Sequence, residues 1–128
     1  MLKILIADDS RTARIIIQRC LEITGLTDCE YMHAADGIEA LAIIKTGGIN
    51  LLITDLNMPK LDGKGLLQAV KSSPRLTDLP VIVVSSLANP AMEKELHSIG
   101  VNSIINKPVS PAKLLESIES IMENGIIS

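Results

Sequence analysis

The sequence predicts an α/β fold, a doubly wound parallel sheet of five strands with helices on both faces, and two observations support this prediction. Five short, mostly apolar runs recur along the chain, and all but Glu30–Ala34 are rich in Ile, Val and Leu, as is typical of strands buried on both faces. Between these runs, apolar residues recur at helical spacing instead. Because a parallel connection needs a crossover of a dozen or more residues, the alternation indicates five strand–helix pairs in one sheet.

The expected elements follow one another in a regular order. The strands are predicted at Lys3–Ala7, Glu30–Ala34, Leu51–Thr54, Val81–Val84 and Ser103–Ile105. Residues that commonly cap helix N-termini precede four of the helices, and these are Ser10, Asp36, Asn89 and Ser110. Glycines mark helix ends at Gly25, Gly47–Gly48 and Gly100. The Asp62-Gly63 pair is interpreted as a turn.

Length and composition favour one domain with an aliphatic core. The chain has 128 residues, of which 47% are hydrophobic, with one Tyr and neither Phe nor Trp. We expect a single domain over residues 1–128, with no output domain after the last helix. The longest apolar run, Ala40–Ile44, is far shorter than the ~20 residues of a membrane span.

Charge and cysteine content argue against a nucleic-acid-binding protein and against a secreted one. The net charge is −3, and no cluster of basic and aromatic residues offers a nucleic-acid surface. The N-terminus reaches Asp8 and Asp9 before a signal-type apolar segment of sufficient length can form. Cys20 and Cys29 therefore fit a reduced pair. We expect a cytoplasmic protein that binds neither nucleic acid nor membrane.

Polar residues end the apolar runs at the edge where open parallel sheets bind their ligands. They are Asp8, Asp9, Asp55, Ser85 and Lys107. Each alone has an ordinary interpretation, such as a carboxylate near a helix N-terminus, a strand-end residue or a surface lysine. Together they predict a site, because three neighbouring carboxylates repel one another unless a cation neutralises them.

A magnesium ion is the simplest cation for this site. Mg²⁺ prefers oxygen ligands and takes one or two carboxylates together with phosphate oxygens. Asp9, Asp55 and a backbone carbonyl after Asp55 suit it. The remaining groups then predict phosphoryl chemistry, with Asp55 as nucleophile and with Ser85 and Lys107 binding phosphoryl oxygens.

In their order and spacing, four motifs resemble the receiver domain of bacterial two-component response regulators, of the stand-alone chemotaxis type. The motifs are Ile4–Ser10, Leu51–Pro59 with Asp62-Gly63, Pro80–Ser85 and Lys107-Pro108. The resemblance covers essentially the whole chain and implies a flavodoxin-like fold with strand order 2-1-3-4-5. It implies a phosphorylation-activated switch that catalyses only its own phosphorylation and dephosphorylation.

The resemblance also implies the ligands of the metal and the phosphoryl donor. Asp55 is the expected phosphoacceptor, and the donor is a sensor histidine kinase or a phosphotransfer protein. Mg²⁺, with Mn²⁺ as an alternative, is expected to bind Asp9 and Asp55 directly and Asp8 through water. The backbone carbonyl of Asn57 is expected to complete the protein ligands.

The expected output is a changed protein-binding face. Ser85 is the implied switch hydroxyl, Lys107 pairs with the phosphoryl group, and the bond before Pro108 is expected to be cis. When Ser85 bonds the phosphoryl group, the loop at 85–89 is drawn inward, and the face of the fourth helix, fifth strand and fifth helix changes. A downstream protein is expected to bind there. A monomer and a phosphorylation-dependent dimer both remain open.

Ile104 and Ser86 depart from the family pattern, and Leu87 occupies a position that, in the family, influences how readily water attacks the phosphoaspartate. Ile104 stands where an aromatic side chain is usual, and a stiff β-branched residue without a hydroxyl cannot replace its rotamer change. We therefore hypothesise that switching runs mainly through the loop after Ser85. Ser86 replaces a smaller residue and narrows access for the phosphodonor. Leu87 cannot hydrogen-bond an attacking water, which predicts a phosphorylated state no shorter-lived than that of a Leu87→Glu variant.

Two alternative functions are weighed against this one. A phosphohydrolase of the haloacid dehalogenase kind also uses an aspartyl nucleophile, but it needs a second Asp two residues later, where this chain has Asn57. No general acid is then placed to turn over small phosphate esters. A pseudo-receiver that serves as a phosphate-independent scaffold is favoured only if an acidic or lysine position is lost, and all are present.

Overall fold

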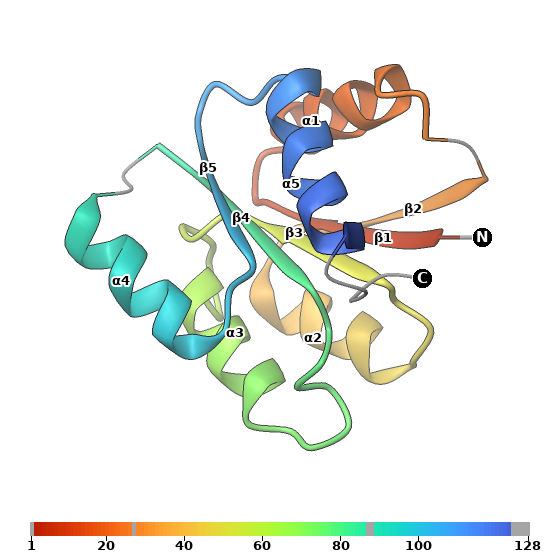
Figure 1. The fold of residues 1–128 in the computed structure, drawn as a ribbon. Coiled ribbons are helices and arrows are strands. Elements are labelled where there is room, and N and C mark those ends of the chain that lie inside the picture. Colours follow the sequence, from red (N-terminus) through yellow and green to blue (C-terminus); the bar gives the residue numbers. More distant parts are fainter. Residues whose placement is uncertain (1, 27, 87–88, 124–128) are drawn as a thin grey trace.

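The computed structural model describes residues 2–26, 28–86 and 89–123, and within them five parallel strands form one sheet (Figure 1). The strands are β1 (Leu2–Ala7), β2 (Cys29–Ala34), β3 (Leu51–Thr54), β4 (Val81–Ser85) and β5 (Ser103–Asn106). The helices are α1 (Arg11–Ile23), α2 (Gly37–Lys45), α3 (Gly63–Lys71), α4 (Pro90–Ile99) and α5 (Pro111–Glu123). The strand order is β2-β1-β3-β4-β5. The predicted α/β class and the order 2-1-3-4-5 are confirmed.

Two aliphatic layers cover the sheet, one on each face. Because side chains alternate along a strand, Ile4 and Ile6 of β1 pack under α1 and α5, whereas Leu5 and Ala7 pack under α2 and α3 (Figure 1). The central strand β3 is buried at every position. No helix in the described ranges is both long and apolar enough to cross a membrane.

The strand ends differ slightly from the prediction. Ser85 and Asn106 are the last residues of β4 and β5 and pair with each other, whereas we expected them to follow the strands. The edge strands β2 and β5 are only partly buried, so the expectation of five fully buried strands was wrong for these two. An edge strand has a neighbour on one side only, and the covering helices do not reach all of it.

Helix starts follow local side-chain chemistry. Ser10, Asp36 and Asn89 accept hydrogen bonds from the backbone N–H three residues later, as predicted for N-caps. Ser110 does the same before α5. The prediction was incomplete at Asp62, which is the N-cap of α3 and accepts from the Gly65 N–H at 2.7 Å, in addition to ending a turn.

Candidate metal centre at the carboxyl edge of the sheet

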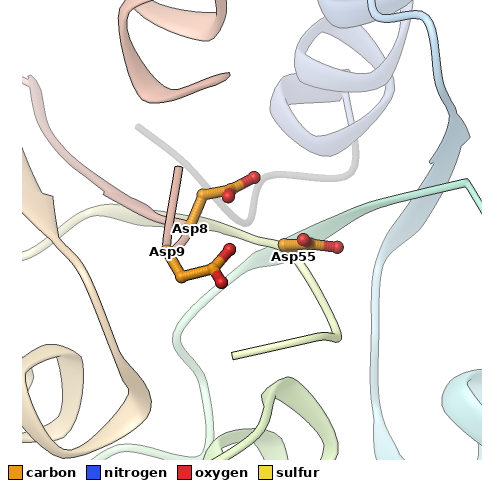
Figure 2. Close-up of side chains that lie close together, drawn as sticks. All are labelled: Asp8, Asp9 and Asp55. Atoms are coloured by element: carbon orange, nitrogen blue, oxygen red, sulfur yellow. The ribbon is translucent and has the colours of Figure 1, made fainter. Parts of the chain in front are cut away.

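Three carboxylates meet where β1 and β3 end. Asp8 and Asp9 follow β1, Asp55 follows β3, and one oxygen from each lies within 4.8 Å of the others. Figure 2 shows the three side chains gathered at this edge, with the Asp9 side chain pointing toward Asp55. The strands are neighbours in the sheet, and the Asp55 N–H donates to the Ala7 carbonyl at 2.9 Å. Strand pairing therefore brings together residues that are far apart in the sequence.

Contacts of both its backbone and its side chain fix the position of Asp55. The residue is buried, with 8% exposed, and its Oδ1 accepts from the Leu56 N–H at 2.8 Å. The start of α3 packs against the same peptide, since a Cβ at Gly63 would lie 2.3 Å from the Asp55 carbonyl oxygen. Only glycine fits at that distance. Asp55 Oδ2 faces the Lys107 ammonium at 3.6 Å.

Asp8 is the most buried of the three, with 1% of the residue exposed. Its Oδ1 accepts from the Ser10 N–H at 2.9 Å, and its Oδ2 lies 3.4 Å from Lys107 Nζ. Burial raises the pKa of Asp8, and the neighbouring Asp55 charge raises it further, while the Ser10 and Lys107 contacts oppose both. The two favourable contacts therefore do not fully compensate the carboxylate for its lost hydration.

The charges at this site do not balance. One ammonium, Lys107, faces two carboxylates, and the third carboxylate, Asp9, is exposed to solvent beside them. Such a set of oxygens fits a hard divalent cation that keeps part of its water shell. The oxygens within 4.8 Å of one another thus form a candidate metal centre, open on the Asp9 side.

Ser85 and Lys107 reach the same edge from β4 and β5. Ser85 is buried, and its carbonyl accepts from the Lys107 N–H at 3.0 Å. The Lys107–Pro108 bond is cis, as expected. The sheet thus places the hydroxyl-bearing strand end and the lysine next to each other, on the side of β3 away from β1.

The remaining predicted positions surround this group. Asn57 lies in the loop after Asp55 with its side chain exposed, and Ser86 and Pro108 are exposed at the same edge. Ile104 is half-buried in β5 and packs against the apolar cluster under α2, α3 and α4. Leu87 lies outside the described residues.

Sequence reasoning missed two residues that shape the site. Gly63 was interpreted only as part of a turn, although its Asp-Gly dipeptide was a signal of special backbone geometry. Arg14 was not singled out, yet its Nη1 donates to the Asp8 carbonyl at 2.5 Å. An arginine on an amphipathic helix carries no such signal in the sequence.

The fold and the site define a class of protein, and sequence comparison agrees. The model of the response regulator receiver domain family matches residues 4–119, so the chain belongs to that family. It is a CheY-like receiver domain of two-component response regulators. Receiver domains of this kind are in general signalling modules and not enzymes, they bind Mg²⁺ through acidic residues, and they interact with histidine kinases or phosphotransfer proteins and with downstream targets.

Individual relatives are similar over nearly the full chain. The chemotaxis protein CheY of Pseudomonas aeruginosa is 40% identical over 122 residues, which cover 95% of this chain and 97% of that protein. The chemotaxis response regulator CheY4 of Vibrio cholerae has a TM-score of 0.83 at 29% identity, covering 94% and 98% of the two chains. The Mn²⁺-bound form of response regulator Rcp1 has a TM-score of 0.77 at 27% identity, covering 98% and 95%.

Proposed function

We propose that this receiver domain accepts a phosphoryl group on the Asp55 carboxylate and relays the signal by protein–protein interaction. The donor is the phosphohistidine of a sensor histidine kinase or phosphotransfer protein. The observation that carries the proposal is the convergence of three carboxylates within 4.8 Å, with the Lys107 ammonium 3.4 Å from Asp8 and 3.6 Å from Asp55. Among the residues that the structure describes, no other group of His, Cys, Asp and Glu side chains could hold a metal ion in this way.

In the proposed transfer one bond forms and one bond breaks. An Asp55 oxygen attacks phosphorus, the P–N bond of the phosphohistidine breaks, and the bonding electron pair stays on the imidazole nitrogen. Asp55 Oδ1 is already engaged by the Leu56 N–H, so Oδ2, which faces Lys107, is the attacking atom. Lys107 then pairs with one phosphoryl oxygen and Ser85 donates to another, which positions and neutralises the group.

The metal proposed for this site is Mg²⁺, bound by Asp9, Asp55 and the Asn57 carbonyl, with Asp8 acting through water. A bound divalent cation supplies neutralisation of the charge on the transferred phosphoryl oxygens. Asp9 is exposed and Asp8 is buried, which suits direct contact for the former and an outer role for the latter. Mn²⁺ is the alternative ion, because it also takes oxygen ligands and the related Rcp1 is described in a Mn²⁺-bound form.

Two surfaces are proposed for partners. An apolar cavity of about 470 Å³ suits a histidine kinase or phosphotransfer protein, because one of its lining residues, Lys107, lies 3.6 Å from the phosphoacceptor Asp55. The cavity is lined by Ala13, Ile16, Ile17, Val84, Lys107, Pro108 and Val109. The face of α4, β5 and α5 is proposed for the downstream target. A groove of about 380 Å³ between β5 and α5, with Ser103 and Lys113 among its lining residues, lies on that face.

Several further points belong to the same proposal. The domain spans residues 1–128, acts in the cytoplasm and binds neither nucleic acid nor membrane, as a monomer or as a phosphorylation-dependent dimer. Its only catalysis is its own phosphorylation and dephosphorylation. A hydrolase acting on small phosphate esters is not favoured, since Asn57 supplies no acid. A phosphate-independent scaffold is not favoured either, because such a scaffold does not need Asp8, Asp9, Asp55 and Lys107 together.

The decisive experiment is phosphorylation with acetyl phosphate and Mg²⁺, read by intact mass. Wild-type protein is expected to gain the mass of one phosphoryl group, and Asp55→Asn is expected to gain none. Asp78→Asn is the matched control, because Asp78 is exposed and lies before β4 at the opposite edge of the sheet. Absence of the added mass in wild type, or its survival in Asp55→Asn, refutes the proposal.

A further inference from the structure

Arg14 connects helix α1 to the main chain of the acidic cluster. Its Nη1 donates to the Asp8 carbonyl oxygen at 2.5 Å, and its own backbone N–H donates to the Ser10 carbonyl in the first turn of α1. Hydrogen bonds from a charged donor are stronger than those between neutral groups. The peptide that joins Asp8 to Asp9 is therefore anchored directly to the first turn of the helix.

A second layer of side chains holds Arg14 in place. Arg14 Nε donates to His33 Nδ1 of β2 at 3.3 Å, and His33 Nε2 lies 2.7 Å from Gln18 Oε1. Because Nδ1 accepts the hydrogen bond from Arg14, the neutral His33 ring carries its hydrogen on Nε2 and donates a hydrogen bond to Gln18 Oε1. Gln18 stands four residues after Arg14, on the same face of α1. The three side chains thus brace α1 against β2 next to the Asp8 carbonyl.

Asp9 depends on this brace more than the other two acids do. Asp8 and Asp55 are held by side-chain contacts to Lys107 and to backbone N–H groups. In the part of the chain that the structure describes, the exposed Asp9 side chain makes no hydrogen bond or ion pair. Its position relative to Asp55 comes from the backbone alone, and the preceding carbonyl is the one that Arg14 binds.

We propose that Arg14, backed by His33 and Gln18, is a positioning residue of the metal centre that orients the Asp8–Asp9 peptide so that the Asp9 carboxylate faces Asp55. This inference rests on the proposed function, since it assigns Asp9 to a divalent cation. Arg14 touches neither the metal nor the phosphoryl group. Its effect appears as metal affinity, because a carboxylate that is free to turn away loses part of its binding free energy on being ordered.

The test is isothermal titration of Mg²⁺ into the purified protein and its variants. Arg14→Gln is expected to raise the Kd for Mg²⁺ about 10-fold, at the lower end of effects for residues that orient metal ligands. Arg19→Gln removes the same charge from an exposed position of α1 and is expected to leave the Kd unchanged. Equal Kd values for wild type and Arg14→Gln overturn the inference.

A double-mutant cycle separates positioning from general loss of stability. His33→Leu removes the acceptor of Arg14 Nε and is expected to raise the Kd by about threefold through Arg14. Combined with Arg14→Gln, it is expected to add nothing further. Additive effects contradict the proposed route from His33 through Arg14 to Asp9. If Arg14→Gln does not fold, Arg14→Lys, which keeps the charge but loses the fork of donors, decides by the same comparison.

The outcome for wild type distinguishes the two proposals. If wild-type protein binds no Mg²⁺ and accepts no phosphoryl group, the proposed function is wrong and the inference fails with it. If wild type does both and Arg14→Gln matches its Kd, the proposed function stands and only the role of Arg14 is refuted.

Discussion

The two edges of the sheet each hold a partly buried lysine, and the two lysines are satisfied in different ways. At the amino edge, Lys71 Nζ donates to the carbonyls of Thr77 and Leu79 at 3.0 and 2.6 Å. At the carboxyl edge, Lys107 faces the carboxylates of Asp8 and Asp55. Burial lowers the pKa of Lys71, with the Asp78 charge opposing the shift.

The difference shows how a structural site and a functional site are built from the same residue type. Backbone carbonyls are neutral dipoles, so Lys71 satisfies the loop before β4 and keeps its own positive charge, on which the Asp78 carboxylate acts. At Lys107 the carboxylates outnumber the ammonium group. The excess negative charge favours binding of a cation. The amino edge is complete by itself, whereas the carboxyl edge is completed by a ligand.

The largest expected effect tests how closely the carboxyl edge is packed. Gly63→Ala is expected to lower the free energy of unfolding by about 3 kcal/mol, because the new Cβ would lie 2.3 Å from the Asp55 carbonyl oxygen and 2.7 Å from Leu56 Cα. Phosphorylation should fall as well, since Asp55 must shift. Urea denaturation and intact mass measure the two effects.

Gly65→Ala is the matched control for that substitution. Gly65 is in the same helix, and a Cβ there would meet the end of the Leu61 side chain at 2.7 Å, which can move. The gain in helix propensity, up to about 1 kcal/mol, offsets that adjustment. A Gly63→Ala variant as stable as Gly65→Ala would contradict the close approach.

Exchanging the two lysines for methionine tests the comparison itself. Lys71→Met is expected to lower the free energy of unfolding by about 2 kcal/mol, because two loop carbonyls lose their donor, and to leave phosphorylation unchanged. Lys107→Met is expected to slow phosphorylation by acetyl phosphate about 100-fold. A variant of Lys71 that loses phosphorylation while remaining folded would show that the two edges are not independent.

A smaller change in the free energy of unfolding, in this case a gain in stability, is expected when Asp8 is replaced. Its folded-state pKa is raised above the ordinary value of 3.8, so without metal its stability contribution is present below pH 3.8 and is lost as the pH rises through the folded pKa. At neutral pH, Asp8→Asn is therefore expected to stabilise the metal-free protein by about 1 kcal/mol. It is also expected to abolish the stabilisation by Mg²⁺. Denaturation in EDTA and in excess Mg²⁺ checks both.

The smallest expected effect is the pH dependence contributed by His33. Burial first, and then the charges of Arg14 and Arg11, lower the pKa of His33 below 6.5. The unfolded chain binds this proton more readily, so stability is fully present above pH 6.5 and is lost as the pH falls through the folded-state pKa. Arg14→Gln is expected to move that pKa upward, as measured by NMR of the imidazole protons. A value unmoved by this change would leave burial and the Arg11 charge as the causes of the lowered pKa.

Local signals predicted most of the fold and much of the candidate site. The five strand–helix pairs follow from apolar periodicity, and the caps at Ser10, Asp36 and Asn89 depend on contacts only three residues long. The clustering of Asp8 and Asp55 was predictable because parallel strands end at a common edge. Whether each acid, Ser85 and Lys107 has its assigned role stays a prediction until the phosphorylation experiment is done.

By itself, the sequence determined the α/β class, an aliphatic core in a chain with one aromatic residue and the set of charged residues at strand ends. These depend on residue type and near-neighbour spacing. Only the tertiary structure decided that Gly63 must be glycine, that Lys107 is shared between two carboxylates, and that Arg14 binds the Asp8 carbonyl with His33 behind it. Such contacts join elements whose mutual positions are set by strand register and helix packing, and periodicity along one chain segment carries no information about them.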